Sequence, residues 1–92
     1  MNITTIQLFA LLQDTVMHIK TGQHLAPNYG YLKNEVLSAF GYNKRASSIK
    51  LLACIGNVYI ELQEDAKTFR DYVVKHGVLD KYNAEVDRLA KD

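Results

Sequence analysis

Tryptophan is absent from this 92-residue sequence, and cysteine and proline occur once each, as Cys54 and Pro27. A single cysteine cannot form a disulfide within the chain, and the usual Cys/His metal site needs several such residues, so we expect neither a disulfide nor a metal. Apolar runs such as residues 8–12 are far shorter than the roughly 20 residues that span a bilayer. No Lys or Arg precedes that run, although a signal peptide would carry one there. These features predict a cytoplasmic protein.

Neither sign of charge dominates, because eleven Lys and Arg residues balance ten Asp and Glu residues and leave a net charge of +1. The composition therefore lacks the strong positive charge of many nucleic-acid and membrane-surface binders. Hydrophobic residues at 48% and charged residues at 23% are usual for a soluble globular domain. A chain of this length builds one hydrophobic core, so we expect a single domain over residues 1–92.

Apolar residues recur at helical spacing along most of the chain, which predicts an all-α fold. The predicted helices cover about residues 3–20, 29–40, 44–76 and 81–90. The predicted N-caps of the first, third and fourth helices are Thr4 or Thr5, Asn43 and Asp80. Glycine is favoured just beyond a helix end, and the first three helices are followed by Gly22, Gly41 and Gly77. We expect a compact, four-helix, bundle-like domain.

The third predicted helix is about twice as long as its neighbours, at about 48 Å for a rise of 1.5 Å per residue. No single neighbour would cover it. Its neighbours could pack on its two halves in turn, it could kink or break at Gly56, or a second copy of the chain could cover part of its apolar face in a homodimer. A strand over residues 57–62 is a further alternative, but the helical phase on both sides favours the helix.

The near-neutral total hides an uneven distribution of charge: the sequence carries +3 up to Lys50 and −2 from Leu51 onward. Basic residues gather at the expected start of the third helix, where the helix dipole favours an anion over a cation. We therefore expect a patch there that binds an anion or a partner, with nearby tyrosines as interface residues. Its predicted members are Tyr29, Tyr31, Lys33, Tyr42, Lys44, Arg45 and Lys50. The alternative is a solvated turn beside half-buried tyrosines.

The second and third predicted helices, joined through Gly41, have the outline of a helix-turn-helix. The match is poor, because Leu37 would lie where a small residue is preferred, and Ser47 and Lys50 would replace apolar residues of the recognition helix. DNA or RNA binding through residues 44–50 is therefore the alternative to protein binding, and it depends on the basic side chains rather than on a motif.

Residues suited to catalysis are few and dispersed. His18, His24 and His76 have no second histidine or carboxylate at a metal-ligand spacing. Cys54 lies in an apolar stretch, which makes a thiol inert. Only a pocket that joins His18 or His24 to a buried carboxylate would favour an enzyme. We therefore expect no catalysis and no cofactor.

Together these features predict a small helical protein that works by binding a larger protein, as an adaptor or an inhibitor. The six tyrosines fit this function, because tyrosine offers contact area and one directed hydrogen bond, although the edges of a small core need such residues as well. Immunity-type proteins that neutralise a toxin are one such class. Small accessory proteins of bacteria and phages share this architecture, and the analogy is one of architecture alone.

Overall fold

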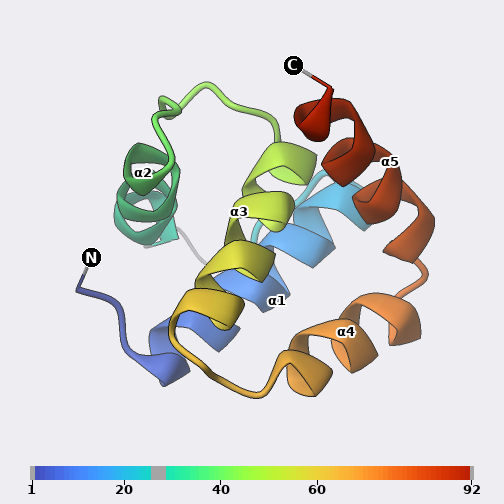
Figure 1. Cartoon of the computed structure of the whole chain (residues 1–92), viewed down its shortest axis with the longest axis horizontal. Coiled ribbons are helices and arrows are strands. Elements are labelled where there is room, and N and C mark those ends of the chain that lie inside the picture. The colour runs from blue at the N-terminus through green and yellow to red at the C-terminus, as the bar shows by residue number, and fades with distance from the viewer. Residues whose placement is uncertain (1, 26–28, 92) are drawn as a thin grey trace.

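The computed structural model describes residues 2–25 and 29–91, and this part of the chain forms five α-helices and no strand (Figure 1). The helices are α1 (Thr5–Thr21), α2 (Gly30–Ala39), α3 (Ser48–Glu61), α4 (Ala66–Lys75) and α5 (Leu79–Ala90). The all-α prediction is therefore confirmed. The prediction of four helices is wrong, because the long third helix is two shorter helices, α3 and α4. The predicted loop over residues 21–28 includes Pro27, which lies outside the described residues.

The ends of α1 follow the sequence closely. Thr4 accepts a hydrogen bond from Gln7 N, and the Gln7 side chain accepts one from Thr4 N, which together form a capping box. Gly22 ends the helix with φ of 75°, in the left-handed region where a residue with a Cβ is strained. Thr4 is thus the cap, and the predicted end near residue 21 is confirmed.

The chain leaves the helical path at residues 62–65, not at Gly56, which lies inside α3. Gln63 takes a positive φ of 53°, and Asp65 then accepts hydrogen bonds from Lys67 N at 3.0 Å and Thr68 Oγ1 at 3.2 Å. An aspartate in this position starts a new helix, because it satisfies the N–H groups that the first turn leaves free. Apolar spacing runs on across the break, since α3 and α4 each turn an apolar face to the same core.

Two of the predicted N-caps are also wrong. The third helix begins at Ser48, and Ser47 caps it by accepting from Lys50 N at 3.3 Å. Asn43 instead accepts from Arg45 N within the connection before the helix. The last helix begins at Leu79, one residue before Asp80, so this carboxylate lies in the first turn, where the helix dipole favours negative charge.

The core forms around α3, which packs against each of the other four helices (Figure 1). Its buried residues include Leu52, Ile55 and Val58, and α1 contributes Leu8 and Leu12. The globule measures 28 × 27 × 26 Å. A homodimer was one of three ways to cover a single helix of about 48 Å. The helices seen here are covered within one chain, so that argument no longer applies.

Three polar side chains are buried in the described part of the chain: Asp14, Thr15 and Glu85. Thr15 donates to Leu11 O at 2.7 Å. Glu85 accepts from Arg88 Nε at 2.5 Å and Arg88 Nη2 at 2.8 Å, and these bonds lower the pKa of the Glu85 carboxyl. Because the pKa is lowered by folding, this pair stabilises the protein at neutral pH and its contribution is lost as the pH falls through that pKa.

Gly56 allows close packing between helices. A Cβ at this position would lie 2.6 Å from Tyr82 Oη and 3.1 Å from Phe69 Cζ, so the rings of α4 and α5 occupy the space that a side chain would take. We expect Gly56→Ala to lower the free energy of unfolding by about 1 kcal/mol, because the clash outweighs the gain in helix propensity.

A matched control for this prediction is Gly30→Ala, since nothing lies within 4 Å of a Cβ at Gly30. This variant should raise the free energy of unfolding by about 0.5 to 1 kcal/mol. Urea titration of both variants and of the wild type measures the two changes. Tyr82→Phe removes the nearest atom and should recover part of the loss in Gly56→Ala. Equal effects of the two alanines would contradict the packing argument.

No helix in the described ranges is both long enough and apolar enough to cross a bilayer.

Candidate functional site

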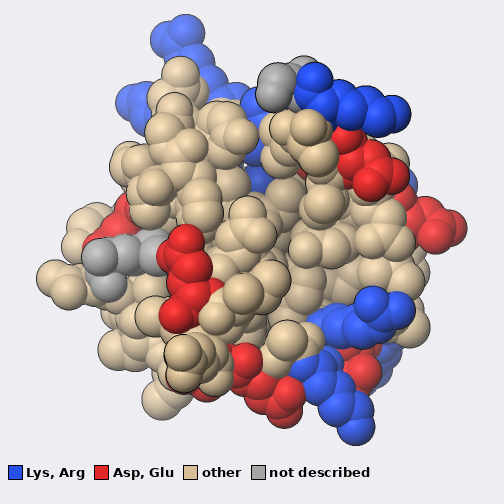
Figure 2. Space-filling model, viewed as in Figure 1, with Lys and Arg blue, Asp and Glu red and all other residues tan. Residues whose placement is uncertain are grey.

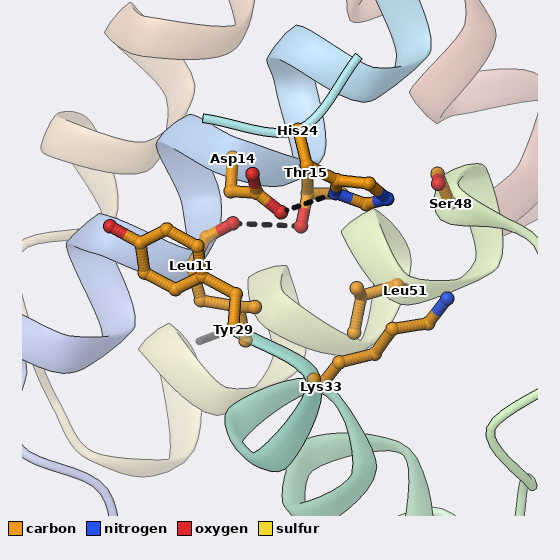
Figure 3. Close-up of a pocket in the computed structure, with 9 residues that line it drawn as sticks. Leu11, Asp14, Thr15, His24, Tyr29, Lys33, Ser48 and Leu51 are labelled. Carbon is orange, nitrogen blue, oxygen red and sulfur yellow. Dashed lines mark hydrogen bonds and ion pairs between the residues drawn. The ribbon is translucent and has the colours of Figure 1, made fainter. Parts of the chain in front are cut away.

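A pocket of about 280 Å³ lies where α1, α2 and the start of α3 meet (Figure 3). The residues that line it come from all three helices and from the segment after α1. They are Leu11, Asp14, Thr15, His24, Tyr29, Gly30, Lys33, Ser48 and Leu51. The pocket therefore combines two apolar leucines with a carboxylate, an imidazole, an ammonium group and a hydroxyl.

A buried carboxylate and a histidine form the centre of this pocket. The Asp14 side chain is only 4% exposed, and its two oxygens accept from His24 Nδ1 at 2.9 Å and from Leu25 N at 2.7 Å. Because a carboxylate can only accept here, the proton of this bond lies on His24 Nδ1. His24 Nε2 points away from Asp14 into the pocket (Figure 3).

A second histidine, His18 on α1, extends this cluster. The rings of His18 and His24 stack with centroids 4.3 Å apart and planes 11° apart. His18 Nδ1 is hydrogen-bonded to Ser48 Oγ, which ties α1 to the first residue of α3. Two of the three dispersed histidines, His18 and His24, are thus brought together with Asp14, whereas His76 lies elsewhere. A pocket that joins such a histidine to a buried carboxylate is the arrangement expected to favour an enzyme.

One sequence signal for this cluster is the spacing of Asp14 and His18, four residues apart and so on one face of α1. The left-handed Gly22 then turns the chain back, which returns His24 to that face. No local pattern fixes how far the chain returns, so His24 could not be placed from the sequence.

Helix α2 supplies two residues of the predicted patch to the pocket. Tyr29 precedes the helix and Lys33 lies four residues later, so both lie on the side of α2 that faces α1. Both side chains are partly buried. Tyr29, the N-cap residue of α2, makes no side-chain hydrogen bond to the first turn of the helix.

The rest of the predicted patch lies outside the pocket. Tyr31 is 70% exposed, and Lys44 and Arg45 are exposed in the connection between α2 and α3. Lys50 places its Nζ 4.6 Å from the centre of the Tyr42 ring, a cation–π contact that holds both side chains. The structure therefore divides the seven predicted residues into three groups. Two line the pocket, Lys50 and Tyr42 form a cation–π pair, and Tyr31, Lys44 and Arg45 are exposed.

The surface charge of residues 1–50 is positive. Both acidic residues of this half, Asp14 and Glu35, accept hydrogen bonds from neighbouring groups. Asp14 is buried, and Glu35 accepts from Asn2 N at 2.8 Å. The ion pairs found among residues 2–25 and 29–91 are Asp14–His24 and Glu85–Arg88, so none of the four cations of the patch forms an ion pair there. Lys50 is nevertheless close enough to Glu85 that its charge helps to lower the pKa of that carboxyl. Figure 2 shows Lys and Arg side chains projecting at the upper left, over the α2–α3 connection, without acidic atoms beside them.

The remaining candidates for chemistry have structural roles. Burial raises the pKa of the Cys54 thiol to about 11, which confirms the inert cysteine predicted from its apolar neighbours. His76 follows the last residue of α4, as predicted, and burial together with Lys20 and Lys75 lowers its pKa. In the ranges that the structure describes, His, Cys, Asp and Glu nowhere gather in a group that could hold a metal ion.

The connection between α2 and α3 spans eight residues, 40–47, whereas a helix-turn-helix has a turn of about three or four. The structure thus disagrees with that motif, as the poor match of Leu37 and Ser47 predicted. Comparison of the chain with protein-family models, with curated proteins and with solved structures finds no match. The function is therefore inferred from the residues of the pocket and the basic surface.

Proposed function

We propose that this protein is a binding module that docks its basic surface against an acidic surface of a larger protein, as an adaptor or an inhibitor. We call that surface the basic face and define it by Tyr29, Tyr31, Lys33, Tyr42, Lys44, Arg45 and Lys50. The observation that carries the proposal is that Lys33, Lys44 and Arg45 form no ion pair in the described part of the chain, while Asp14 and Glu35 accept hydrogen bonds from other groups. Unpaired charge of one sign speeds and orients association with a surface of the opposite sign.

The tyrosines of the basic face favour a protein partner. Tyr31 is largely exposed, so its ring and hydroxyl are available to a partner. Tyr and Arg are enriched at the centre of protein interfaces, and the basic face holds three tyrosines and Arg45. The contact of Lys50 with Tyr42 also restricts both side chains before binding, which reduces the entropy lost on association.

The size of the molecule suits a protein that occupies the surface of another. An interface of standard size buries about 800 Å² on each partner. The accessible surface here is 5747 Å², so one such interface uses about one seventh of it. A toxin with an acidic active-site rim is one class of partner that such an inhibitor would neutralise.

The test compares Lys44→Glu/Arg45→Glu with the control Lys67→Glu/Arg70→Glu, which makes the same charge change at exposed positions of α4. Each tagged protein is used to capture partners from native cells, and the bound proteins are quantified by mass spectrometry. We expect a partner with an acidic surface to fall at least about tenfold in the first variant, since each buried charge pair that is reversed costs several kcal/mol. The control should retain it.

Two results would contradict the proposal. One is a set of captured proteins that both variants retain equally, because the basic face would then play no part. The other is a wild-type gel shift with DNA or RNA at about 50 mM salt that the first variant loses, which would assign the basic face to phosphate binding. Nuclease treatment of the cell extract separates direct protein partners from those held through nucleic acid.

A further inference from the structure

We propose that the pocket between α1, α2 and α3 binds a small organic acid, with the carboxylate on its polar side and an apolar body against Leu11 and Leu51. This site is separate from the exposed Lys44 and Arg45, which carry the proposed docking to a protein. The proposal depends on the side chains that converge on one cavity, and on the way in which Asp14 orients His24.

The polar side of the pocket presents hydrogen-bond donors. Lys33 brings its ammonium group from α2, and the Lys33 Nζ, Ser48 Oγ and His24 Nε2 atoms lie on the same side of the cavity (Figure 3). When His24 is protonated, its Nε2–H donates into the pocket, while Nδ1–H stays bonded to Asp14. Ser48 Oγ can accept from His18 Nδ1 and donate its own proton to a ligand.

The charge of the site matches one carboxylate. Asp14 carries −1, but both of its oxygens are occupied by His24 Nδ1 and Leu25 N and do not face a ligand as free acceptors. Lys33 carries +1 and forms no ion pair in the described part of the chain, so it is the charge that a single carboxylate of a ligand would meet.

The apolar lining of the pocket determines the body of the ligand. Leu11, Leu51 and the Tyr29 ring offer apolar surface, which a bare inorganic anion would leave uncovered. The volume of about 280 Å³ lies just below the range of roughly 300 to 1,000 Å³ that takes drug-sized ligands. A monocarboxylic acid with one ring or a short branched chain fits this combination of size and surface.

The experiment titrates the ¹⁵N-labelled protein with sodium benzoate at constant pH and ionic strength and follows amide and histidine-ring NMR signals. We expect saturable shifts centred on His24, Lys33 and Ser48, with a Kd on the order of 1 mM for so small a ligand. Benzyl alcohol keeps the ring without the charge, and inorganic phosphate keeps a charge without the ring. Shifts that do not saturate, or equal binding of either control compound, would overturn the proposal.

The matched variants are Lys33→Met and Lys44→Met, which remove the same charge inside and outside the pocket. Lys33→Met should weaken benzoate at least about tenfold and Lys44→Met less than about twofold, because only the first charge touches the ligand. His24→Phe gives a second measurement: it keeps a ring to stack on His18 and removes Nε2, and it should weaken benzoate similarly. An equal loss of benzoate affinity in the two Lys variants would contradict a specific site in this pocket.

A carboxylate can come from a free acid or from an acidic side chain of a partner, and a capped glutamate distinguishes the two. Tighter binding of N-acetylglutamate amide than of benzoate assigns the site to a partner's side chain, and the reverse order assigns it to a free acid. Both orders support a carboxylate pocket. If neither compound binds, the pocket proposal is wrong and the docking proposal is unaffected, because docking is tested separately at Lys44 and Arg45.

Discussion

Val58→Glu should abolish the cooperative fold of this protein. Val58 is fully buried on α3, the helix that contacts all the others, so the new carboxylate would lie in the core with no cation to pair with it. An unpaired buried charge costs several kcal/mol, and a domain of this size is stable by only about 5 to 14 kcal/mol. Far-UV circular dichroism during heating should show a weak, broad transition or none.

Ile60→Glu is the control, because it places the same side chain two residues further along α3, where Ile60 is 65% exposed. This variant should unfold within about 0.5 kcal/mol of the wild type, as most surface substitutions do. Similar melting of the two variants would contradict the position of α3 at the centre of the fold. The burial of Val58 also means that a glutamate there reports on folding and cannot serve as a test of dimerisation.

The helical class and several helix ends follow from the sequence because they depend on local chemistry. Gly22, Gly41 and Gly77 all adopt positive φ just beyond a helix, as their placement after apolar periodic segments predicts. Thr4 is recognisable as a cap because Gln7 follows three residues later. In each case the deciding interactions lie within one turn of the helix.

The break between α3 and α4 could not be found from periodicity. Apolar spacing reports which side of a helix faces the core, and Phe69 and Val73 on α4 face the same core as Val58 on α3. The phase therefore continues although the backbone does not. Asp65 is a local signal for the break, because its spacing to Thr68 suits an N-cap. Gly56, the predicted position of a break, is instead a point of close packing.

The candidate site was predicted only in part for a similar reason. Tyr29 and Lys33 belong to a charged and aromatic segment that stands out in the sequence, and both line the pocket. Asp14 and His24 do not stand out, because their chemistry arises when the chain turns at Gly22 and packs on α1. Charge and composition thus predict the residues of the proposed basic face, while the Asp14–His24 pair depends on tertiary contacts.

The buried carboxylate of this pair supports the second large prediction. Asp14→Ala should lower the free energy of unfolding by about 2 to 4 kcal/mol, because it removes the acceptor of two hydrogen bonds to a charged group and leaves a cavity beside α1. Half of the His24 side chain is exposed, so water replaces part of what is lost and the effect stays below that of Val58→Glu. Urea titration measures the difference.

Asp14→Asn separates the packing of this side chain from its effect on His24. The amide oxygen can still accept from Leu25 N, and the amide nitrogen can donate to His24 Nδ1. The loss of stability should therefore fall below about half of that in Asp14→Ala. In neutral His24 the ring proton must then move from Nδ1 to Nε2, which the ¹⁵N shifts of the ring report. If the ring proton of His24 stays on Nδ1 in Asp14→Asn, then the hydrogen bond to Asp14 does not determine which ring nitrogen carries the proton. That result would contradict the orienting role of Asp14.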